Sequence, residues 1–251
     1  MIIKYVHSVR RAAAFAAFVL ALILLTGTPA KVREITLEED TALSEAEARK
    51  AHPDVVPLPM PGKTGPLSVE EAIERRRSIR EFTDAPVLLK EVGQLLWAAQ
   101  GITDKGGHRA APSAGATYPI ELFVVAGNVD GLGPAVYHYN VKEHSLEVVR
   151  RGDLRGALSD EALSQEWMED AALSIVIGGV YSRAMERYEE RGIRYVHVEV
   201  GAVAENVYLQ ATTLGLGATL VGAFDDDGVK ELLRMEGVQP FGIMPVGVPS
   251  R

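Results

Sequence analysis

A long helix near the C-terminus constrains the fold of this chain most strongly. Between Arg194 and Leu214, apolar residues recur at steps of three and four, which places them on one face of a helix. These residues are Val196, Val200, Val203, Val207, Ala211 and Leu214. Such a continuous apolar face has to be buried, so the pattern predicts a core helix over 194–214.

The segments around this helix alternate between predicted strands and shorter helices. Strands are predicted at 120–126, 136–140, 145–150, 172–179, 217–224 and 242–248. Helices are predicted at 69–77, 88–101, after Asp153 and over 225–235. Ser68 and Glu71 have the spacing of a capping box for the first of these helices, and Gly101 ends the second. Mixed strands and helices with a hairpin at 136–150 predict an α+β fold.

Composition excludes several classes of function. The chain has 251 residues, of which 47% are hydrophobic and 24% charged, as expected for one globular domain with an appendage. A net charge of −8 argues against nucleic-acid binding, and the lack of cysteine excludes thiol catalysis, iron–sulfur clusters and cysteine-bound zinc. The six histidines lack metal-ligand spacing, and Ser113 lies outside any G-x-S-x-G motif. Two glycine patterns lack the third glycine of a Rossmann fingerprint.

The N-terminus differs from the rest of the chain. Lys4, Arg10 and Arg11 precede an uncharged run over residues 12–30, which ends in a small-x-Ala cleavage pattern. This pattern predicts a signal or membrane anchor over residues 1–30, with the main domain outside the membrane. A buried core helix is the alternative. Residues 31–66 follow as a charged and proline-rich spacer that reads as a stiff tether, and the predicted domain covers 67–251.

A cluster of arginines follows the first predicted helix in "RRRSIREF". Arg76 and Arg80 are four residues apart and would share a helical face, with the Ser78 hydroxyl nearby. Two guanidinium groups and a hydroxyl make a clamp for a phosphate group. The alternative is that these arginines complement the dipole of the helix C-terminus and stay solvated.

Five compact residues precede the strand at 120–126 in "APSAGATYPIELFVV". Small side chains at 112–116 let backbone N–H groups approach a flat ligand closely, and Tyr118 could pack against a ring. The alternative is a tight loop packed under a lid. Gly222 and Ala223, at the end of a predicted strand, are a second place where backbone could approach a ligand.

Several segments together resemble the FMN-dependent nitroreductase family, and more closely its SagB-type dehydrogenase branch, which includes azoline oxidases. They are "RRSIREF", "PSAGATYPIELFVV", "ERGIRYVHVEVGAVAENVYLQATTLGLGATLVGAF" and "PVGVP", and the resemblance runs from about Ser68 to the C-terminus. It implies an antiparallel sheet wrapped by helices, in an intertwined homodimer with FMN in each of two interface sites.

The resemblance also implies roles for individual residues. Cofactor binding falls to Arg76, Arg77, Ser78, Arg80, Pro112, Ser113, Ala114, Gly115, Gly222, Ala223 and Arg251. In this assignment the "RRSIR" residues hold the phosphate and ribityl chain, residues 112–115 line the isoalloxazine face, and residues 222–223 lie near its reactive edge. Tyr188 and Tyr118 are the leading catalytic candidates.

Two positions depart from the azoline oxidases. Arg187 and Tyr188 stand where those enzymes have a Lys-Tyr pair, and Ala202 stands where the branch often has histidine. An arginine stays protonated and cannot act as a general base, which argues against azoline oxidation.

The predicted function is that of an FMN-dependent oxidoreductase acting on a small organic or peptide-derived substrate. The predicted electron donor is NAD(P)H or a membrane partner, since nicotinamide nucleotides are scarce outside the cytoplasm. The predicted location is membrane-anchored or exported, with a cytoplasmic domain as the alternative. An alternative function is a membrane-tethered flavin-binding or sensing module without turnover.

Overall fold

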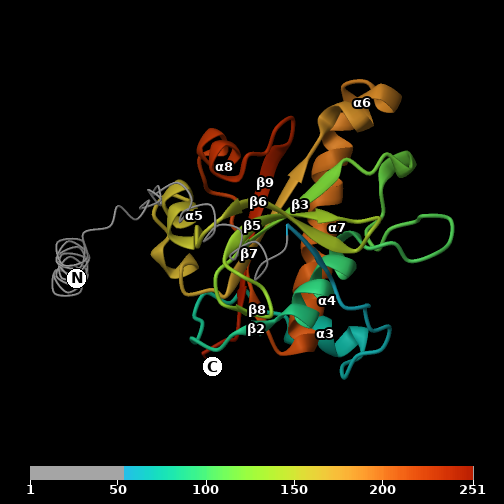
Figure 1. The fold of residues 1–251 in the computed structure, drawn as a ribbon. Coiled ribbons are helices and arrows are strands. Elements are labelled where there is room, and N and C mark those ends of the chain that lie inside the picture. Colours follow the sequence, from blue (N-terminus) through green and yellow to red (C-terminus); the bar gives the residue numbers. More distant parts are fainter. Residues whose placement is uncertain (1–53, 251) are drawn as a thin grey trace, which may run out of the picture. The chain divides into compact units, whose positions relative to one another are not determined.

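A seven-stranded antiparallel sheet forms the centre of the structure, a computed structural model in which residues 54–250 are described (Figure 1). The strand order is β1-β6-β5-β3-β7-β9-β8, and β2 pairs with β4 in a separate parallel ribbon. The strands are β1 (Val55–Pro57), β2 (Val87–Leu88), β3 (Ile120–Ala126), β4 (Val129–Asp130), β5 (Ala135–Asn140), β6 (Ser145–Arg151), β7 (Leu173–Gly179), β8 (Gly217–Ala218) and β9 (Gln239–Gly247). This α+β arrangement confirms the predicted fold class.

Helices cover both faces of the sheet. They are α3 (Val69–Arg75), α4 (Leu89–Gln100), α5 (Arg155–Glu161), α6 (Tyr181–Tyr188), α7 (Arg191–Leu214) and α8 (Asp226–Leu233), with short 3-10 turns η1 (Ala114–Ala116) and η2 (Glu166–Met168). None of the helices within residues 54–250 is long and apolar enough to cross a membrane. The predicted leader at 1–30, residues 31–53 of the spacer, and Arg251 lie outside the described residues.

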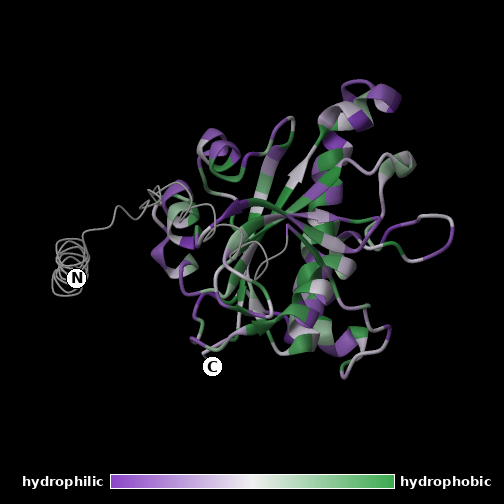
Figure 2. Ribbon diagram, in the orientation of Figure 1, coloured by the Kyte–Doolittle hydropathy of each residue, from purple (hydrophilic) through white to green (hydrophobic). Residues whose placement is uncertain are grey.

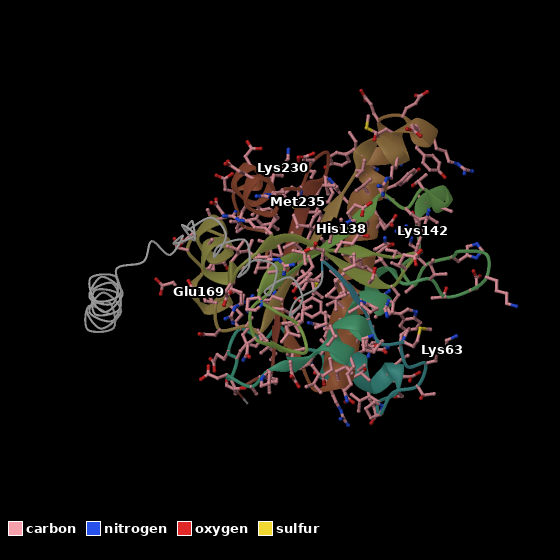
Figure 3. All side chains as sticks on the ribbon, viewed as in Figure 1. Lys63, His138, Lys142, Glu169, Lys230 and Met235 are labelled. Atoms are coloured by element: carbon pink, nitrogen blue, oxygen red, sulfur yellow. The ribbon has the colours of Figure 1, made fainter. Side chains whose placement is uncertain are left out.

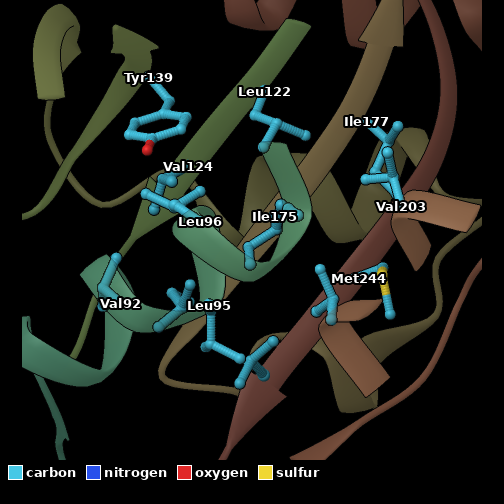
Figure 4. Close-up of a cluster of buried hydrophobic side chains, with 14 of the residues drawn as sticks. Val92, Leu95, Leu96, Leu122, Val124, Tyr139, Ile175, Ile177, Val203 and Met244 are labelled. Carbon is cyan, nitrogen blue, oxygen red and sulfur yellow. The ribbon is translucent and has the colours of Figure 1, made fainter. Parts of the chain in front are cut away.

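The two faces of the sheet carry separate apolar cores. On one face, Leu122 and Val124 of β3 pack with α4 and α7, as Figure 4 shows for Leu95 and Leu96. On the other face, Phe123 of β3 packs with residues of α5 and α8. Successive side chains of β3 enter opposite cores. Because both cores are apolar, the sequence of β3 is an almost continuous apolar run. Figure 2 shows green along the central strands, with purple concentrated on α5, α6 and α8.

The core helix that the apolar spacing predicts is α7. It begins three residues earlier than predicted, at Arg191, and ends at Leu214, followed by Gly215, whose φ of 74° is the left-handed conformation typical of a glycine C-cap. Val196, Val203 and Val207 are completely buried, as predicted. Leu214, the last residue of the pattern, is only partly buried.

Two predicted elements end earlier than expected. The first helix ends at Arg75 and not at 77, because Arg76 turns out of the helix with φ −53° and ψ 127°. The strand predicted over 217–224 pairs only at Gly217–Ala218, with one further bridge between Val221 and Ile243. It is interrupted because the Leu220 N–H donates to the Tyr208 hydroxyl, 2.6 Å away, instead of to a neighbouring strand.

The end of the predicted spacer belongs to the domain. Residues 55–57 form β1, which pairs with the outer side of β6, and Leu58 is buried in the core. The Leu58 N–H also donates to the carbonyl of His144 at 3.0 Å. Within the described residues the predicted spacer therefore contains the edge strand β1, followed by a strap over residues 60–69. The folded domain begins before residue 67.

Truncating Ile175 is expected to show how much the core between the sheet and α7 stabilises the fold. Ile175 lies on β7 with no exposed surface, so Ile175→Ala should lower the free energy of unfolding by about 2–5 kcal/mol. Leu163→Ala is the control, since Leu163 is 67% exposed and should change this free energy by less than about 0.5 kcal/mol. Urea denaturation followed by circular dichroism measures both; equal effects would contradict the assignment of Ile175 to the core.

Candidate functional site

The arginine segment, residues 76–80, lies beside β8 and is not helical. The Ile79 N–H donates to the carbonyl of Ala218 at 3.0 Å, and Ser78 forms a parallel bridge with Ala218. A Cβ on Gly217 would lie 2.6 Å from the Ile79 side chain, so glycine is required for this approach. The prediction that Arg76 and Arg80 share a helical face is therefore wrong. Arg76 and Ser78 instead face one side because alternate residues of an extended segment do so.

Tyr208 of α7 organises this segment. The guanidinium carbon of Arg76 lies 5.0 Å from the centroid of the Tyr208 ring, and the Ser78 hydroxyl lies 3.5 Å from the Tyr208 hydroxyl. The same hydroxyl accepts the N–H of Leu220. Tyr208 is not among the residues predicted from the sequence. The only sequence feature that could have indicated it is its position directly after Val207, on the apolar face of the core helix.

The guanidinium groups of Arg76 and Arg80 have no acidic partner among the described residues. Within residues 54–250 neither forms an ion pair with a carboxylate, and Arg80 lies 5.9 Å from the ring of Trp167. The two arginines adjacent to Arg76 do have hydrogen-bond partners within the chain. Arg75 pairs with Glu71 at 3.2 Å, and Arg77 donates to the carbonyls of residues 74 and 76 at 2.8 and 2.7 Å.

Gly222 and Ala223 lie next to the arginine segment. Leu220, which Tyr208 holds, precedes them by two residues, and the Gln165 side chain beside Trp167 donates to the carbonyl of Ala223 at 3.2 Å. Both residues are exposed, and a Cβ on Gly222 would meet nothing within 4 Å. The structure thus brings five predicted residues onto one surface, the clamp face: Arg76, Ser78, Arg80, Gly222 and Ala223.

The small residues before β3 form a strained loop, the shelf loop (residues 112–118). Gly115, Ala116 and Tyr118 have φ values of 59°, 54° and 45°, a conformation that costs non-glycine residues about 1–2 kcal/mol each. The Ser113 hydroxyl accepts the N–H of Tyr118 at 2.9 Å, and the Thr117 hydroxyl donates to the Ala114 carbonyl at 3.0 Å. The side chain of Ser113 therefore points into its own loop.

Two arginines of α6 hold the shelf loop from outside. Arg187 donates to the carbonyl of Gly115 at 3.1 Å, and Arg183 donates to the carbonyl of Tyr118 at 3.0 Å. A Cβ on Gly115 would lie 2.5 Å from the Tyr188 hydroxyl, so only glycine leaves room there. Tyr188 thus lies against the shelf loop, at the position where sequence analysis places a catalytic candidate.

A charged network extends from the shelf loop to the sheet. Arg183 pairs with Glu121 at 2.6 Å, and Nε2 of His138, labelled in Figure 3, lies 2.7 Å from the other carboxylate oxygen. Burial alone would raise the pKa of Glu121, but the hydrogen bonds from His138 and Arg183 outweigh it and lower that pKa. Arg109 lies 4.5 Å from the ring of Tyr118, so one face of this predicted catalytic ring is already covered.

The shelf loop and the clamp face lie at different ends of α7. The shelf loop meets α6 and Glu199, whereas the clamp face meets Tyr208, nine residues further along the helix, which is about 14 Å of helix. Figure 1 shows α3, which leads into the arginine segment, and α6 at opposite ends of α7. The predicted cofactor residues of one chain therefore form two separate groups.

A cavity of about 570 Å³ lies elsewhere, between the strap at residues 60–69, α4 and α7. It is lined by polar side chains that include Gln94, Asn206 and Gln210. None of the predicted site residues borders it.

Comparison with known proteins gives a match to the family model described as the Nitroreductase family, over residues 73–248. The chain belongs to the nitroreductase family. A protein of Methanocaldococcus jannaschii that is named as a nitroreductase is 41% identical over 181 residues, covering 72% of this chain and 91% of the relative. A crystal structure titled as a nitroreductase from Ralstonia eutropha has a TM-score of 0.70 and 29% identity, covering 79% of this chain and 90% of the other.

A relative from a peptide-processing system is also similar. The microcin B17-processing protein McbC of Escherichia coli is 28% identical over 170 residues, covering 65% of this chain and 62% of McbC. This likeness agrees with the resemblance to the SagB-type branch. Membership in the nitroreductase family makes the protein an oxidoreductase and confirms the predicted family.

Proposed function

We propose that this nitroreductase-family protein is an FMN-dependent oxidoreductase. The observation that carries the proposal is the clamp face, where two guanidinium groups without acidic partners in residues 54–250 flank a hydroxyl beside an open glycine. The phosphate of FMN is an anion for which two guanidinium forks and a hydroxyl are suitable donors. The open surface at Gly222 leaves room for the rest of the cofactor, so the residues present fit the group.

The proposed roles follow from this fit. Arg76, Ser78 and Arg80 hold the phosphate and ribityl chain, and Gly222 and Ala223 face the ring system with their backbone. When bound, FMN supplies the chemistry by accepting and giving up a hydride or electron pairs, and the protein orients and shields it. Tyr188 and Tyr118 are the proposed proton donors near the ring, and Arg251 is a further phosphate ligand.

The second wall of the site comes from another copy of the chain in this proposal. The shelf loop and Tyr208 lie about 14 Å apart along α7, and in this proposal residues 112–115 line the ring bound by a partner. The exposed face of α7 supports such pairing, since Val198 is 67% exposed and a Cβ on Gly201 would meet nothing within 4 Å. A small residue beside an exposed apolar one allows two helices to cross closely.

The substrate class is proposed as a small organic or peptide-derived molecule, with NAD(P)H or a membrane partner as electron donor. The likeness to McbC, a microcin B17-processing protein, supports a peptide-derived substrate. Arg187, bound to the Gly115 carbonyl, cannot act as the base of an azoline oxidase. Of the pair Arg187 and Tyr188, only Tyr188 can therefore donate or accept a proton. The leader predicted over residues 1–30 supports export or membrane anchoring as the proposed location.

The purified chain tests this proposal directly. We expect a yellow protein whose visible spectrum is that of an oxidised flavin, with about one FMN per chain identified by mass after release, because a twofold dimer holds two equivalent sites. Bleaching of the flavin by NADH or NADPH, and its return on adding an electron acceptor, would demonstrate turnover. A colourless, folded protein that does not take up added FMN would contradict the proposal.

A further inference from the structure

An acidic residue interrupts the apolar strand that follows the shelf loop. Glu121 is the second residue of β3, and the other side chains of this strand are all apolar. It points to the same side of the sheet as Phe123, which belongs to one of the two cores, because alternate residues of a strand share a face. The side chain of Glu121 is only 17% exposed. A carboxyl group in such surroundings is unfavourable unless it has partners, and none of the roles proposed above uses this residue.

Both oxygens of the Glu121 carboxylate have a partner. Its Oε1 lies 2.6 Å from Nη1 of Arg183, and its Oε2 lies 2.7 Å from Nε2 of His138. Burial raises the pKa of Glu121, but the hydrogen bonds from His138 and Arg183 outweigh burial and lower that pKa, so the group is ionised at neutral pH. With a different partner on each oxygen, the carboxylate cannot rotate without losing a contact.

The same nitrogen of Arg183 connects the carboxylate to the shelf loop. Nη1 carries two protons, and it also donates to the carbonyl of Tyr118 at 3.0 Å. One proton is therefore available for the Glu121 carboxylate and one for the Tyr118 carbonyl. A long arginine side chain loses much rotamer freedom when it is ordered, and a single neutral carbonyl is a weak anchor for it. The carboxylate thus fixes the guanidinium group, and the guanidinium group fixes the end of the loop.

The conformation of the shelf loop requires such support. Ala116 and Tyr118 have left-handed φ values of 54° and 45°, which persist only where the surroundings enforce them. Within the loop, the N–H groups of Ala116, Thr117 and Tyr118 donate to the Ser113 carbonyl, the Ala114 carbonyl and the Ser113 hydroxyl, at 3.1, 3.2 and 2.9 Å. These three N–H groups are protected from exchange only while the strained loop persists, so their exchange reports how firmly it is held.

We propose that Glu121 is a positioning residue, which holds the shelf loop in place through Arg183. None of the hydrogen bonds within residues 54–250 joins the Glu121 side chain directly to the loop; its partners are Arg183 and His138. Its effect on the loop therefore passes through the guanidinium group. The consequence for cofactor affinity rests on the proposed function, in which residues 112–115 line the ring of FMN.

Hydrogen exchange of the cofactor-free, full-length protein tests this role without any flavin. In Glu121→Ala, peptides covering residues 113–118 should exchange about tenfold faster, since loss of one charge-assisted contact shifts local opening by about that factor. Arg183→Ala should have the same effect. The double variant should exchange no faster than Arg183→Ala alone, because Glu121 acts only through this arginine. Peptides from α8 should be unchanged and control for a general loss of stability.

Arg187→Ala is the matched control background. Arg187 also holds the loop from α6, through the Gly115 carbonyl at 3.1 Å, but it forms no ion pair with a carboxylate in the described part of the chain. Adding Glu121→Ala to Arg187→Ala should therefore still speed loop exchange about tenfold, because the path through Arg183 is intact there. Equal effects of Glu121→Ala in the two arginine backgrounds, or no effect in the unmodified chain, would overturn the proposal.

Glu121→Gln keeps the test decisive if Glu121→Ala fails to fold. The amide retains an oxygen acceptor for Arg183 but loses the charge, so loop exchange should rise only about threefold. The same rise should appear in the Arg187→Ala background and be absent in the Arg183→Ala background. A rise of the same size in both backgrounds would show that Glu121 does not act through Arg183.

FMN titration extends the test to the cofactor. The dissociation constant for FMN, followed by quenching of flavin fluorescence, should rise about fivefold in Glu121→Ala and in Arg183→Ala, and no further in the double variant. A protein that binds no FMN in any form contradicts the proposed function, whereas the exchange result still decides the role of Glu121. Equal FMN affinity in all variants, despite a loosened loop, would overturn the link to the cofactor.

Discussion

Replacing Arg76 and Arg80 together by alanine is expected to strip FMN from the protein. Charge-assisted hydrogen bonds contribute about 1.5–3 kcal/mol each, so losing both guanidinium groups should weaken FMN binding at least about a hundredfold. Neither arginine pairs with a carboxylate within the described residues, so the change leaves no acidic group without a partner and the fold should persist. Fluorescence titration with FMN measures the affinity, and thermal unfolding checks the fold.

Arg75→Ala is the matched control for this double variant. Arg75 lies one residue before Arg76 but points to Glu71 in an exposed pair on α3, and such pairs contribute about 0.3–0.5 kcal/mol. Its removal lowers the positive charge next to the clamp face without removing a proposed ligand, so FMN affinity should change less than twofold. A double variant that still binds FMN as tightly as the control would show that the phosphate lies elsewhere.

The elements that the sequence predicts well are those fixed by local patterns. The strand 120–126 and the helix α7 follow from runs of apolar residues whose period matches their burial in the structure. The N-terminus of α3 follows from its capping box, in which the Ser68 hydroxyl and the Glu71 carboxylate bond each other's backbone N–H groups. Each of these features depends on residues that are close together in the chain.

The failures all involve contacts between distant residues. Nothing near Arg75 signals the end of α3, because the helix stops where residues 78–79 dock onto Ala218. The strand at 217–224 is cut short by the hydroxyl of Tyr208, and residues 55–57 of the predicted spacer form a strand only by pairing with β6. Such pairings depend on the assembled fold and leave no periodic signal.

The same distinction between local patterns and long-range contacts applies to the candidate site. The predicted site residues form separate groups in the structure, with Arg76, Ser78 and Arg80 in one extended segment and 112–115 in one loop. Motifs do not show how far apart the groups lie, which is set by the length of α7 between Glu199 and Tyr208. Tyr208 itself went unnoticed because it occurs within a helix whose pattern is explained by burial.

A dimeric site of this kind should recover when two defective chains are combined. The clamp variant is Arg76→Ala with Arg80→Ala. The shelf variant is Gly115→Asp, whose new side chain must displace the Tyr188 hydroxyl that lies 2.5 Å from the added Cβ, although Asp tolerates the left-handed φ better than most residues. Each variant alone should bind little FMN, since every site in its homodimer lacks one wall.

In a heterodimer the two defects share one site and leave the other intact. Co-expressed chains with different affinity tags, purified through both tags, should therefore carry about one FMN per dimer, because a twofold interface builds each of its two sites from both chains. Flavin absorbance per mole of dimer gives this ratio. If the clamp and the shelf loop of one chain served the same cofactor, each chain of the heterodimer would keep its own defect, and mixing would recover no flavin at all.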